Sequence, residues 1–362
     1  MAFRTRRRLV CAAVAATLVG TVPATSANAD TADEGDEGRS NNPPTTTFDP
    51  TKLATGKTQA PYVDRKMLHD GNKKLKLNVP HDVWNAYRLR NGYLIETDDP
   101  KTGWGVIYYR VTPKGQVTKL RRFPKGVWSL HVDTGGRKVA IETETADSSA
   151  LTVLNAFTNK IIRRKNLGKH DALDYVNGRV LLTRGVNRST LAWYRPGTNK
   201  TRKIGSVAGW ARFADPGINV IGLSAGQGHS CFDVRRFKAP RKRLWRLCGG
   251  KGIQNGIWFS PDGKRAMTTE SIHGRPKPET VYVRRVSDGK VIREFKAARF
   301  GSLAWENNRT IVVEAAAHSQ AARVRCTVGG TCKRVSRLVK ARSDFRALDK
   351  LDSLFMDVRL LT

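Results

Sequence analysis

From about residue 59 onward, the chain alternates short apolar runs with turns, and no stretch shows the 3.6-residue period of a convincing amphipathic helix. The runs are rich in β-branched and aromatic residues, which favour strands. One set of four such runs is Trp258–Phe259, Arg265–Met267, Val281–Val283 and Val291–Phe295. Apolar and polar positions alternate in part of each run, so the pattern predicts an all-β fold.

Two families of turns recur along the chain, the first at intervals of 39 to 46 residues. The first falls at Gly92, Gly136, Gly178, Gly217, Gly263 and Asn308. The second falls near Gly71, Gly115, Asn159, Asn199, Ala239, Gly289 and Gly330. A period of this length, with four short strands in each repeat, predicts the blades of a β-propeller.

The number of blades follows from the two ends of the chain. Tyr62–Leu68 and Leu75–Val79, on either side of a turn at Gly71, match the two outer strands of a blade. Phe345–Leu348 and Leu354–Leu361 match the two inner strands. We therefore predict seven four-stranded blades, the last closed by both termini, because such closure removes exposed sheet edges. Six blades with a separate terminal appendage is the alternative.

One turn carries a recognisable motif. Ile257–Arg265 reads Ile-Trp-Phe-Ser-Pro-Asp-Gly-Lys-Arg, in which Pro261 fixes φ and Gly263 supplies the positive φ that reverses the chain. The Ser-Pro-Asp-Gly-Lys run resembles the repeat signature of TolB-like/WD40-like (PD40-type) secreted propellers; Trp128–Arg137 and Trp210–Gly217 keep only its outline. The resemblance covers residues 59–362 and implies a rigid disc that binds partners on its faces, often without catalysis.

The first 29 residues have the parts of a signal peptide. A basic start with four arginines precedes an apolar core, Leu9–Val22, and Ala27-Asn28-Ala29 supplies the small residues of a cleavage site. The start also resembles a twin-arginine signal, so both export routes stay open. We expect a secreted protein, extracellular or associated with the cell envelope.

Residues 30–58 are rich in Asp, Glu, Thr and Pro and nearly free of large apolar groups. Such a segment buries too little surface to offset the entropy of ordering, so it is predicted to be a disordered acidic linker ahead of a propeller at 59–362. Beyond the signal no apolar run is long enough for a transmembrane helix. We expect a monomer without a transmembrane segment.

Four cysteines follow the signal, and an even number in an exported chain favours two disulfides. Cys231 and Cys248 lie almost symmetrically about a turn at Ala239, and Cys326 and Cys332 flank a Gly-Gly turn in the same way. Residues so placed face each other across a hairpin, so the pairs Cys231–Cys248 and Cys326–Cys332 are predicted. A zinc site is the rival interpretation, but the Cys-x-x-Cys spacing typical of such sites is missing.

The chain is strongly basic, with 65 Lys and Arg against 31 Asp and Glu and a formal net charge of +34. Part of the charge is clustered in a short stretch that contains Arg235, Arg236, Lys238, Arg241, Lys242, Arg243 and Arg246. A field of this sign attracts polyanions, and outside a cell these include anionic wall polymers, lipid head groups, acidic polysaccharide and DNA. No nucleic-acid motif accompanies the charge, so sequence-specific nucleic-acid binding is not expected. A basic surface without a specific ligand remains the alternative.

Three histidines, His229, His273 and His318, recur at the blade period between second and third strands. Equivalent positions face one side of a propeller, so these imidazoles are candidates for a divalent metal or for acid-base chemistry. The alternative is three solvated loop histidines. Gly222–Gly226 matches a Gly-x-Ser-x-Gly nucleophile elbow, but no helix is predicted after the serine, so a loop is favoured.

Trp84, Trp128, Trp210, Trp258 and Trp305 recur near the inner strands. Packing between blades is the favoured role, and an aromatic binding platform is the alternative.

These observations favour an exported, non-enzymatic binding protein whose basic surface engages an anionic cell-envelope or extracellular polymer. Two alternatives stay open: a propeller enzyme, such as a metal-assisted lyase or hydrolase that uses the histidine-bearing face, and a protein-interaction scaffold. The sequence assigns no catalytic residue and implies no cofactor.

Overall fold

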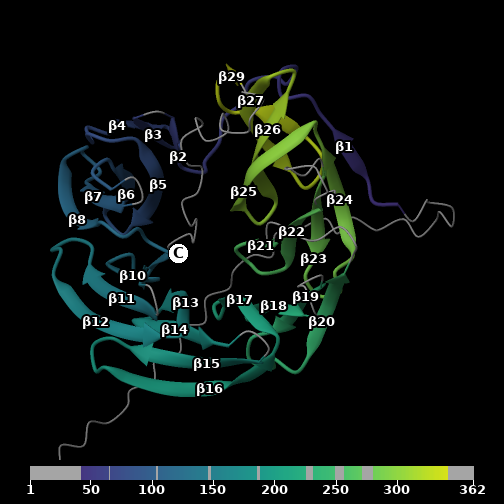
Figure 1. Cartoon of the computed structure of the whole chain (residues 1–362). Helices are drawn as coiled ribbons and strands as arrows, with labels where there is room; N and C mark the ends of the chain where they lie inside the picture. The colour runs from purple at the N-terminus through teal and green to yellow at the C-terminus, as the bar shows by residue number, and fades with distance from the viewer. Residues whose placement is uncertain are drawn as a thin grey trace, which may run out of the picture. The chain divides into compact units, whose positions relative to one another are not determined.

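The computed structural model describes residues 42–340, apart from residues 65, 103–104, 146–147, 186–187, 226–230, 249–256 and 271–279. The described residues of the unit that begins at Pro43 form seven sheets, which follow one another around a centre as the blades of a propeller (Figure 1). In this described part of the chain no helix is long and apolar enough to cross a membrane. The prediction of an all-β propeller with seven blades is confirmed, and the six-bladed alternative is wrong.

The blades use their strands in chain order. Blade 1 contains β2 (Tyr62–Asp64), β3 (Met67–Asp70) and β4 (Lys73–Lys76). Blade 2 contains β5 (Val83–Leu89), β6 (Gly92–Asp99), β7 (Gly105–Val111) and β8 (Val117–Phe123). Blade 3 contains β9 (Ser129–Val132), β10 (Lys138–Thr145), β11 (Ser148–Asn155) and β12 (Ile161–Gly168). Blade 4 contains β13 (His170–Val176), β14 (Arg179–Arg184), β15 (Arg188–Arg195) and β16 (Lys200–Ala208). Blade 5 contains β17 (Trp210–Asp215), β18 (Val220–Ala225), β19 (Cys231–Arg236) and β20 (Arg243–Cys248). Blade 6 contains β21 (Ile257–Phe259), β22 (Arg265–Glu270), β23 (Thr280–Arg285) and β24 (Val291–Lys296), and β1 (Thr45–Thr47) pairs with β24. Blade 7 contains β25 (Arg299–Asn307), β26 (Thr310–Ala317), β27 (Gln320–Thr327) and β28 (Cys332–Arg334), and β29 (Val339–Lys340) pairs with β27.

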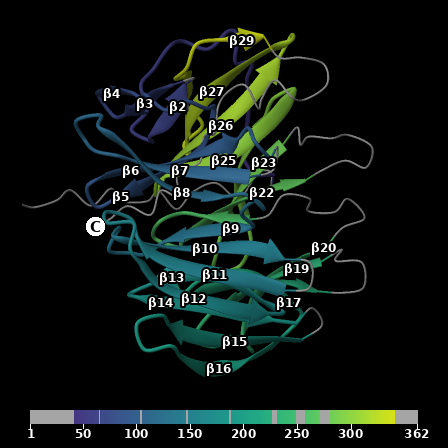
Figure 2. The same cartoon turned by 60° about the vertical axis from the view of Figure 1, so that its left-hand side comes forward.

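The core lies between neighbouring blades. In Figure 1 the first strands β13, β17, β21 and β25 lie towards the centre, and the fourth strands β8, β12, β16, β20 and β24 lie outside. Figure 2 shows several blades as successive layers. Every residue of β26 is buried, because a second strand is covered by a blade on each face. Apolar side chains from adjacent blades share one cluster, as Val63 of blade 1 and Ile95 of blade 2 do.

The Ser-Pro-Asp-Gly-Lys turn joins three blades. The Gly263 amide donates to the Ser260 carbonyl oxygen (2.8 Å), and the Ser260 hydroxyl donates to the Asp262 carboxylate (2.6 Å). Gly263 has a φ of 65°, and a Cβ there would lie 2.7 Å from the Cβ of Ile218 in blade 5. On the other side, the Asp262 amide donates to the side chain of Asn308 in blade 7 (3.0 Å). The motif therefore fixes both the turn and its contacts with the neighbouring blades.

Blade 1 differs in detail from the expectation. Tyr62–Leu68 does not form a single strand, because it contains all of β2 and the start of β3, and the amino-terminal segment supplies three strands rather than two. The turn at Gly71 lies between β3 and β4, where the second turn family lies in every other blade. The inner strands expected from Phe345–Leu348 and Leu354–Leu361 lie outside the described residues.

The structured part of the chain begins earlier than expected. Residues 43–58 fall in the segment assigned to a disordered linker, yet β1 pairs in parallel with β24, and the Phe48 ring packs edge-on against Phe300 with centroids 5.9 Å apart. The edge of β24 supplies backbone partners that the composition of the segment does not reveal. Residues 1–41, which include the expected signal peptide, lie outside the described residues.

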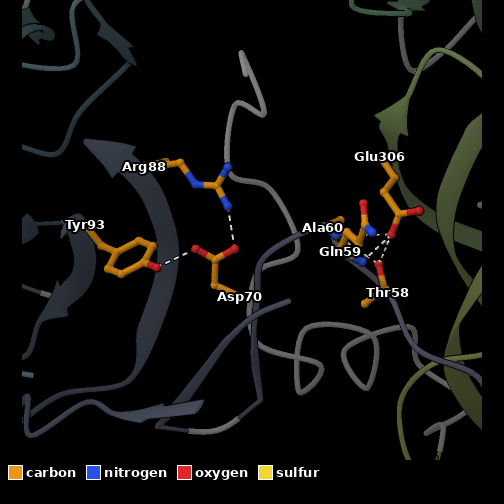
Figure 3. A network of polar contacts seen from close by, with 7 residues as sticks. All are labelled: Thr58, Gln59, Ala60, Asp70, Arg88, Tyr93 and Glu306. Carbon is orange, nitrogen blue, oxygen red and sulfur yellow. Dashed lines mark hydrogen bonds and ion pairs between the residues drawn. The ribbon is translucent and has the colours of Figure 1, made fainter. Parts of the chain in front are cut away.

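The amino-terminal segment also fastens blade 1 to blade 7. Figure 3 shows the Glu306 carboxylate accepting hydrogen bonds from the Thr58 hydroxyl (2.5 Å) and from the amides of Gln59 (2.5 Å) and Ala60 (3.1 Å). Its other oxygen accepts from Arg325 (2.5 Å). Burial raises the pKa of Glu306, but the hydrogen bonds outweigh burial and hold this pKa below its usual value. The carboxylate is thus charged and saturated with donors.

Two further contacts lie along the same seam. The Arg323 guanidinium lies over the Tyr62 ring, 4.8 Å from its centroid, and Tyr62 stacks on His69 with the centroids 4.4 Å apart. Arg337 pairs with Asp64 (3.3 Å). Among the described residues, the closure of the ring therefore rests on polar and aromatic contacts as well as on apolar packing.

Candidate polyanion-binding surface

The basic cluster of the sequence lies on the outermost hairpin of blade 5, formed by β19 and β20. Cys231 at the start of β19 and Cys248 at the end of β20 lie opposite each other, and a disulfide joins them as predicted, with an S–S distance of 2.04 Å. The predicted Cys326–Cys332 disulfide (2.00 Å) closes the β27–β28 hairpin in the same way. Both hairpins are cross-linked between directly paired strands.

Two members of the cluster hold the hairpin together. Asp233 is buried in β19 and accepts from Arg246 (2.5 and 3.0 Å) and from Arg235 (2.7 Å). Burial raises the pKa of Asp233, but the hydrogen bonds and charges of these arginines prevail and lower it. Asp233 is the only acid between the two cysteines, a signal from which this role could have been inferred. Arg235 and Arg246 are therefore anchors within the hairpin.

The other five cations of the cluster are exposed: Arg236, Lys238, Arg241, Lys242 and Arg243. None of their side chains makes an ion pair with a residue that the structure describes. The backbone beneath them is held in place, because the Phe237 amide donates to the Asn219 carbonyl oxygen (3.0 Å) and the Lys238 amide donates to the Asn219 side chain (2.8 Å). We call these five residues the hairpin cations.

The histidine-bearing face is only partly described. His229 and His273 lie outside the described residues. The exposed His318 lies in the turn between β26 and β27, with Nε2 3.2 Å from the Asp49 carboxylate. Within the described ranges, no group of three or more His, Cys, Asp and Glu residues could hold a metal ion. Ser224 of the Gly-x-Ser-x-Gly run lies inside strand β18, paired with Phe232.

The tryptophans divide into two groups. Trp305 is 5% exposed and donates through Nε1 to the Trp258 carbonyl oxygen (2.9 Å), as expected for packing between blades. For Trp84 and Trp128 that expectation is wrong, because these residues are 44% and 67% exposed. Trp84 is the extra residue of a β-bulge between Val83 and Asn85, a feature that redirects a side chain. The side chain of Trp210 is not among those described.

A second network, also drawn in Figure 3, connects blades 1 and 2. Arg88 of β5 and the hydroxyl of Tyr93 of β6 both donate to the carboxylate of Asp70 at the end of β3. Asp70 and Tyr93 line a hollow of about 180 Å³ together with Lys73 and Lys74. Burial, with the hydrogen bond to Asp70, raises the pKa of Tyr93, which stays a neutral donor. Two lysines of the outer strand β4 thus line the hollow.

Taken together, the chain is a seven-bladed β-propeller with a basic outer hairpin. No family model and no curated protein matches it. Similar solved structures include TolB from Acinetobacter baumannii, 14% identical, with a TM-score of 0.43 over 71% of this chain and 64% of that one. A chain of the Mitotic Checkpoint Complex is 9% identical, with a TM-score of 0.48 over 74% and 89%.

An uncharacterized protein, lmo1340, from Listeria monocytogenes EGD-e is 7% identical, with a TM-score of 0.48 over 74% of this chain and 86% of that chain. TolB, one of these neighbours, gives its name to the class of propellers that the turn motif resembles. At such identities and scores the likeness carries no argument about function, which has to come from the residues of this chain.

Proposed function

We propose that this protein is an exported, non-enzymatic binding propeller whose basic outer hairpin engages an anionic polymer of the cell envelope or its surroundings. The observation that carries the proposal is that the basic residues of the β19–β20 hairpin fall into two groups, one paired inside the hairpin and one exposed. Asp233 pairs with two arginines inside it, whereas the five hairpin cations are exposed and lack an acidic partner among the described residues. Export rests on the signal-like start of the sequence.

The physical basis is the cost of bringing like charges together. Cations crowded on one hairpin repel one another, and a polyanion relieves this repulsion and releases its own counterions on binding. A hairpin closed by a disulfide and fastened to the Asn219 loop presents the charges at fixed positions, which reduces the entropy lost on binding.

The test is binding of the purified protein to isolated cell envelope over a series of salt concentrations. One variant replaces Arg236, Lys238, Arg241 and Lys242 with Gln. The matched control replaces Arg137, Arg179, Lys264 and Arg309 with Gln. These are exposed cations in, or directly after, the turns between first and second strands. Arg246 stays unchanged in both variants, because its loss would remove two of the three arginine hydrogen bonds to the buried Asp233 carboxylate.

We expect the binding of the wild type to weaken steeply as the salt concentration rises. For the hairpin variant, the slope of log K against log salt concentration should be shallower by about 3. The control variant should bind nearly as the wild type does. If the two variants weaken binding equally, or if an unrelated protein of equal net charge binds as well as the wild type, the hairpin is not a site.

A protein-interaction scaffold is the second candidate, and the exposure of Trp84 and Trp128 favours it. Exposed indoles at the starts of inner strands in neighbouring blades suit contact with a partner protein, since tryptophan is enriched at interfaces. This function predicts a partner whose binding survives high salt and is lost when both tryptophans are replaced with Ala.

A further inference from the structure

The outer strands of five consecutive blades form an uninterrupted basic arc. In Figure 1, β4, β8, β12, β16 and β20 follow one another around the outside of the propeller. Together they contain fourteen Lys and Arg, three in each of β4, β8, β12 and β16 and two in β20, and no Asp or Glu. We call these five strands the basic arc.

The arc is an outer-strand property and does not simply reflect the composition of the chain. Over the whole sequence, basic residues outnumber acidic residues about two to one, 65 against 31. The first strands of blades 2 to 5, namely β5, β9, β13 and β17, contain two Arg and three Asp. Positive charge is thus concentrated at the circumference.

Edge protection alone does not account for this pattern. An exposed edge strand is shielded from pairing with other chains by charged residues, above all Lys. Half of the fourteen cations of the arc are Arg, however, and no acid accompanies them. The single sign favours a ligand of the opposite sign.

The charges of the arc are also largely available. Within the described residues only two of the fourteen make ion pairs, Arg122 with Asp99 and Arg246 with Asp233. Most of the others are exposed, including all three lysines of β4 and all three cations of β16. Two of those lysines, Lys73 and Lys74, line the hollow beside Tyr93.

The edges themselves are open along the arc and covered beyond it. In the described part of the chain no strand pairs with the outer side of β4, β8, β12, β16 or β20. In blade 6 the outer strand β24 is covered by β1, and in blade 7 Arg334 of β28 exchanges backbone hydrogen bonds with Ala54 and Gly56. The amino-terminal segment thus occupies the two edges that the arc leaves out. Free backbone N–H groups on the open edges add further donors for anionic oxygens.

We infer that a long linear polyanion lies along the circumference and contacts the outer strands of several blades at once. This inference rests on the proposed function and specifies its ligand, because isolated head groups or short anions reach only one blade. Packed sheets are about 10 Å apart, and blade edges diverge outward, so a ligand that touches all five edges extends over more than about 40 Å. The polymer carries repeated phosphate or carboxylate groups.

The test measures affinity against polymer length. Oligoglutamates of about 5 and about 40 residues reach at most roughly 18 and 140 Å, and they are compared at equal concentrations of carboxylate. Size-fractionated inorganic polyphosphate, short and long, forms the second arm and distinguishes phosphate from carboxylate. Two variants remove charge far from the hairpin: Lys73, Lys74 and Lys76→Gln in blade 1, and Lys200, Arg202 and Lys203→Gln in blade 4. The control is Arg137, Arg179 and Lys264→Gln.

We expect the long polymers to bind at least about 100-fold more tightly than the short ones, since additional contacts on one chain act as intramolecular events. Each arc variant should weaken long-polymer binding about tenfold and make its salt dependence shallower by about 2, whereas the control changes little. Short polymers should bind the arc variants nearly as well as the wild type.

The outcomes separate the two proposals. If polymers bind equally at both lengths, and only the hairpin variant weakens binding, the extended arc is wrong and the hairpin site stands. If the wild type binds no polymer above an unrelated protein of equal charge, both proposals are wrong. Urea midpoints of all variants, measured in parallel, show whether a loss of binding comes from unfolding.

Discussion

Replacing Glu306 with Gln tests whether a buried carboxylate fastens the ends of the described ring. Its side chain is 1% exposed and accepts hydrogen bonds from Thr58, Gln59, Ala60 and Arg325. The amide keeps the shape, but it removes the charge and turns an NH₂ group towards the Arg325 guanidinium. Bonds to a charged group contribute about 1.5 to 3 kcal/mol each and neutral bonds about 0.5 to 1.5 kcal/mol, so we expect the free energy of unfolding to fall by about 2 to 4 kcal/mol.

The loss of stability caused by Glu306→Gln should depend on pH in a defined direction. The folded-state pKa of Glu306 is lowered, so its contribution is fully present above the ordinary value of 4.5 and disappears as pH falls through the folded-state pKa. The difference between wild type and Glu306→Gln should therefore be largest at neutral pH and shrink in acid.

The assay is urea unfolding followed by tryptophan fluorescence at pH 7 and at decreasing acidic pH, combined with limited proteolysis of residues 43–60. The control is Asp288→Asn, which breaks the exposed pair with Arg285 and should change stability far less than Glu306→Gln does. A Glu306→Gln effect as small as that of the control, or one that grows as pH falls, would refute the reasoning.

Three further predictions concern stability. Removal of the Cys231–Cys248 disulfide should lower the free energy of unfolding in urea by about 3 kcal/mol, and removal of Cys326–Cys332 should lower it by about 2 kcal/mol. The first loss is larger because that disulfide closes the longer loop, with a separation of 17 against 6 residues. The opposite order would contradict the loop-entropy argument. Gly263→Val should lower the urea midpoint by the equivalent of about 1 to 3 kcal/mol, since φ is positive and the blade 5 turn leaves no space for a Cβ; an unchanged midpoint would show that the turn adapts. Trp305→Ala should cost about 3 to 5 kcal/mol and Trp128→Ala less than about 0.5 kcal/mol in thermal or urea unfolding, and equal losses would contradict their difference in burial.

Periodicity and turn chemistry allowed most of the fold to be predicted. The recurrence of glycine and asparagine turns reflects a local requirement for positive φ, which a sequence shows directly. The disulfides were predictable for a similar reason, because symmetric placement about a turn puts Cys231 opposite Cys248 without any knowledge of tertiary structure.

The errors arose where a residue depends on a distant partner. Residues 43–58 are ordered by the edge of β24 and by Glu306, about 250 positions away, so their composition was a poor guide. Trp84 is exposed because of a bulge that periodicity does not reveal. The hairpin cluster was located correctly, but the separation of two anchoring arginines from the hairpin cations depends on the burial of Asp233.

The fastening of the amino-terminal segment to blade 7 has a consequence for how the chain folds. Thr58 leaves the ribosome early, yet its partner Glu306 lies 248 residues later. Local blades can pair as they emerge, since each is built from neighbouring hairpins, whereas the seam waits for nearly the whole chain. Contacts of such long sequence separation form slowly, because the entropy of closing the loop is lost before the contact stabilises anything. The edge of β24 stays unpaired until β1 adds to it, so the period just before closure is the time at which the folding protein is most exposed to misassembly.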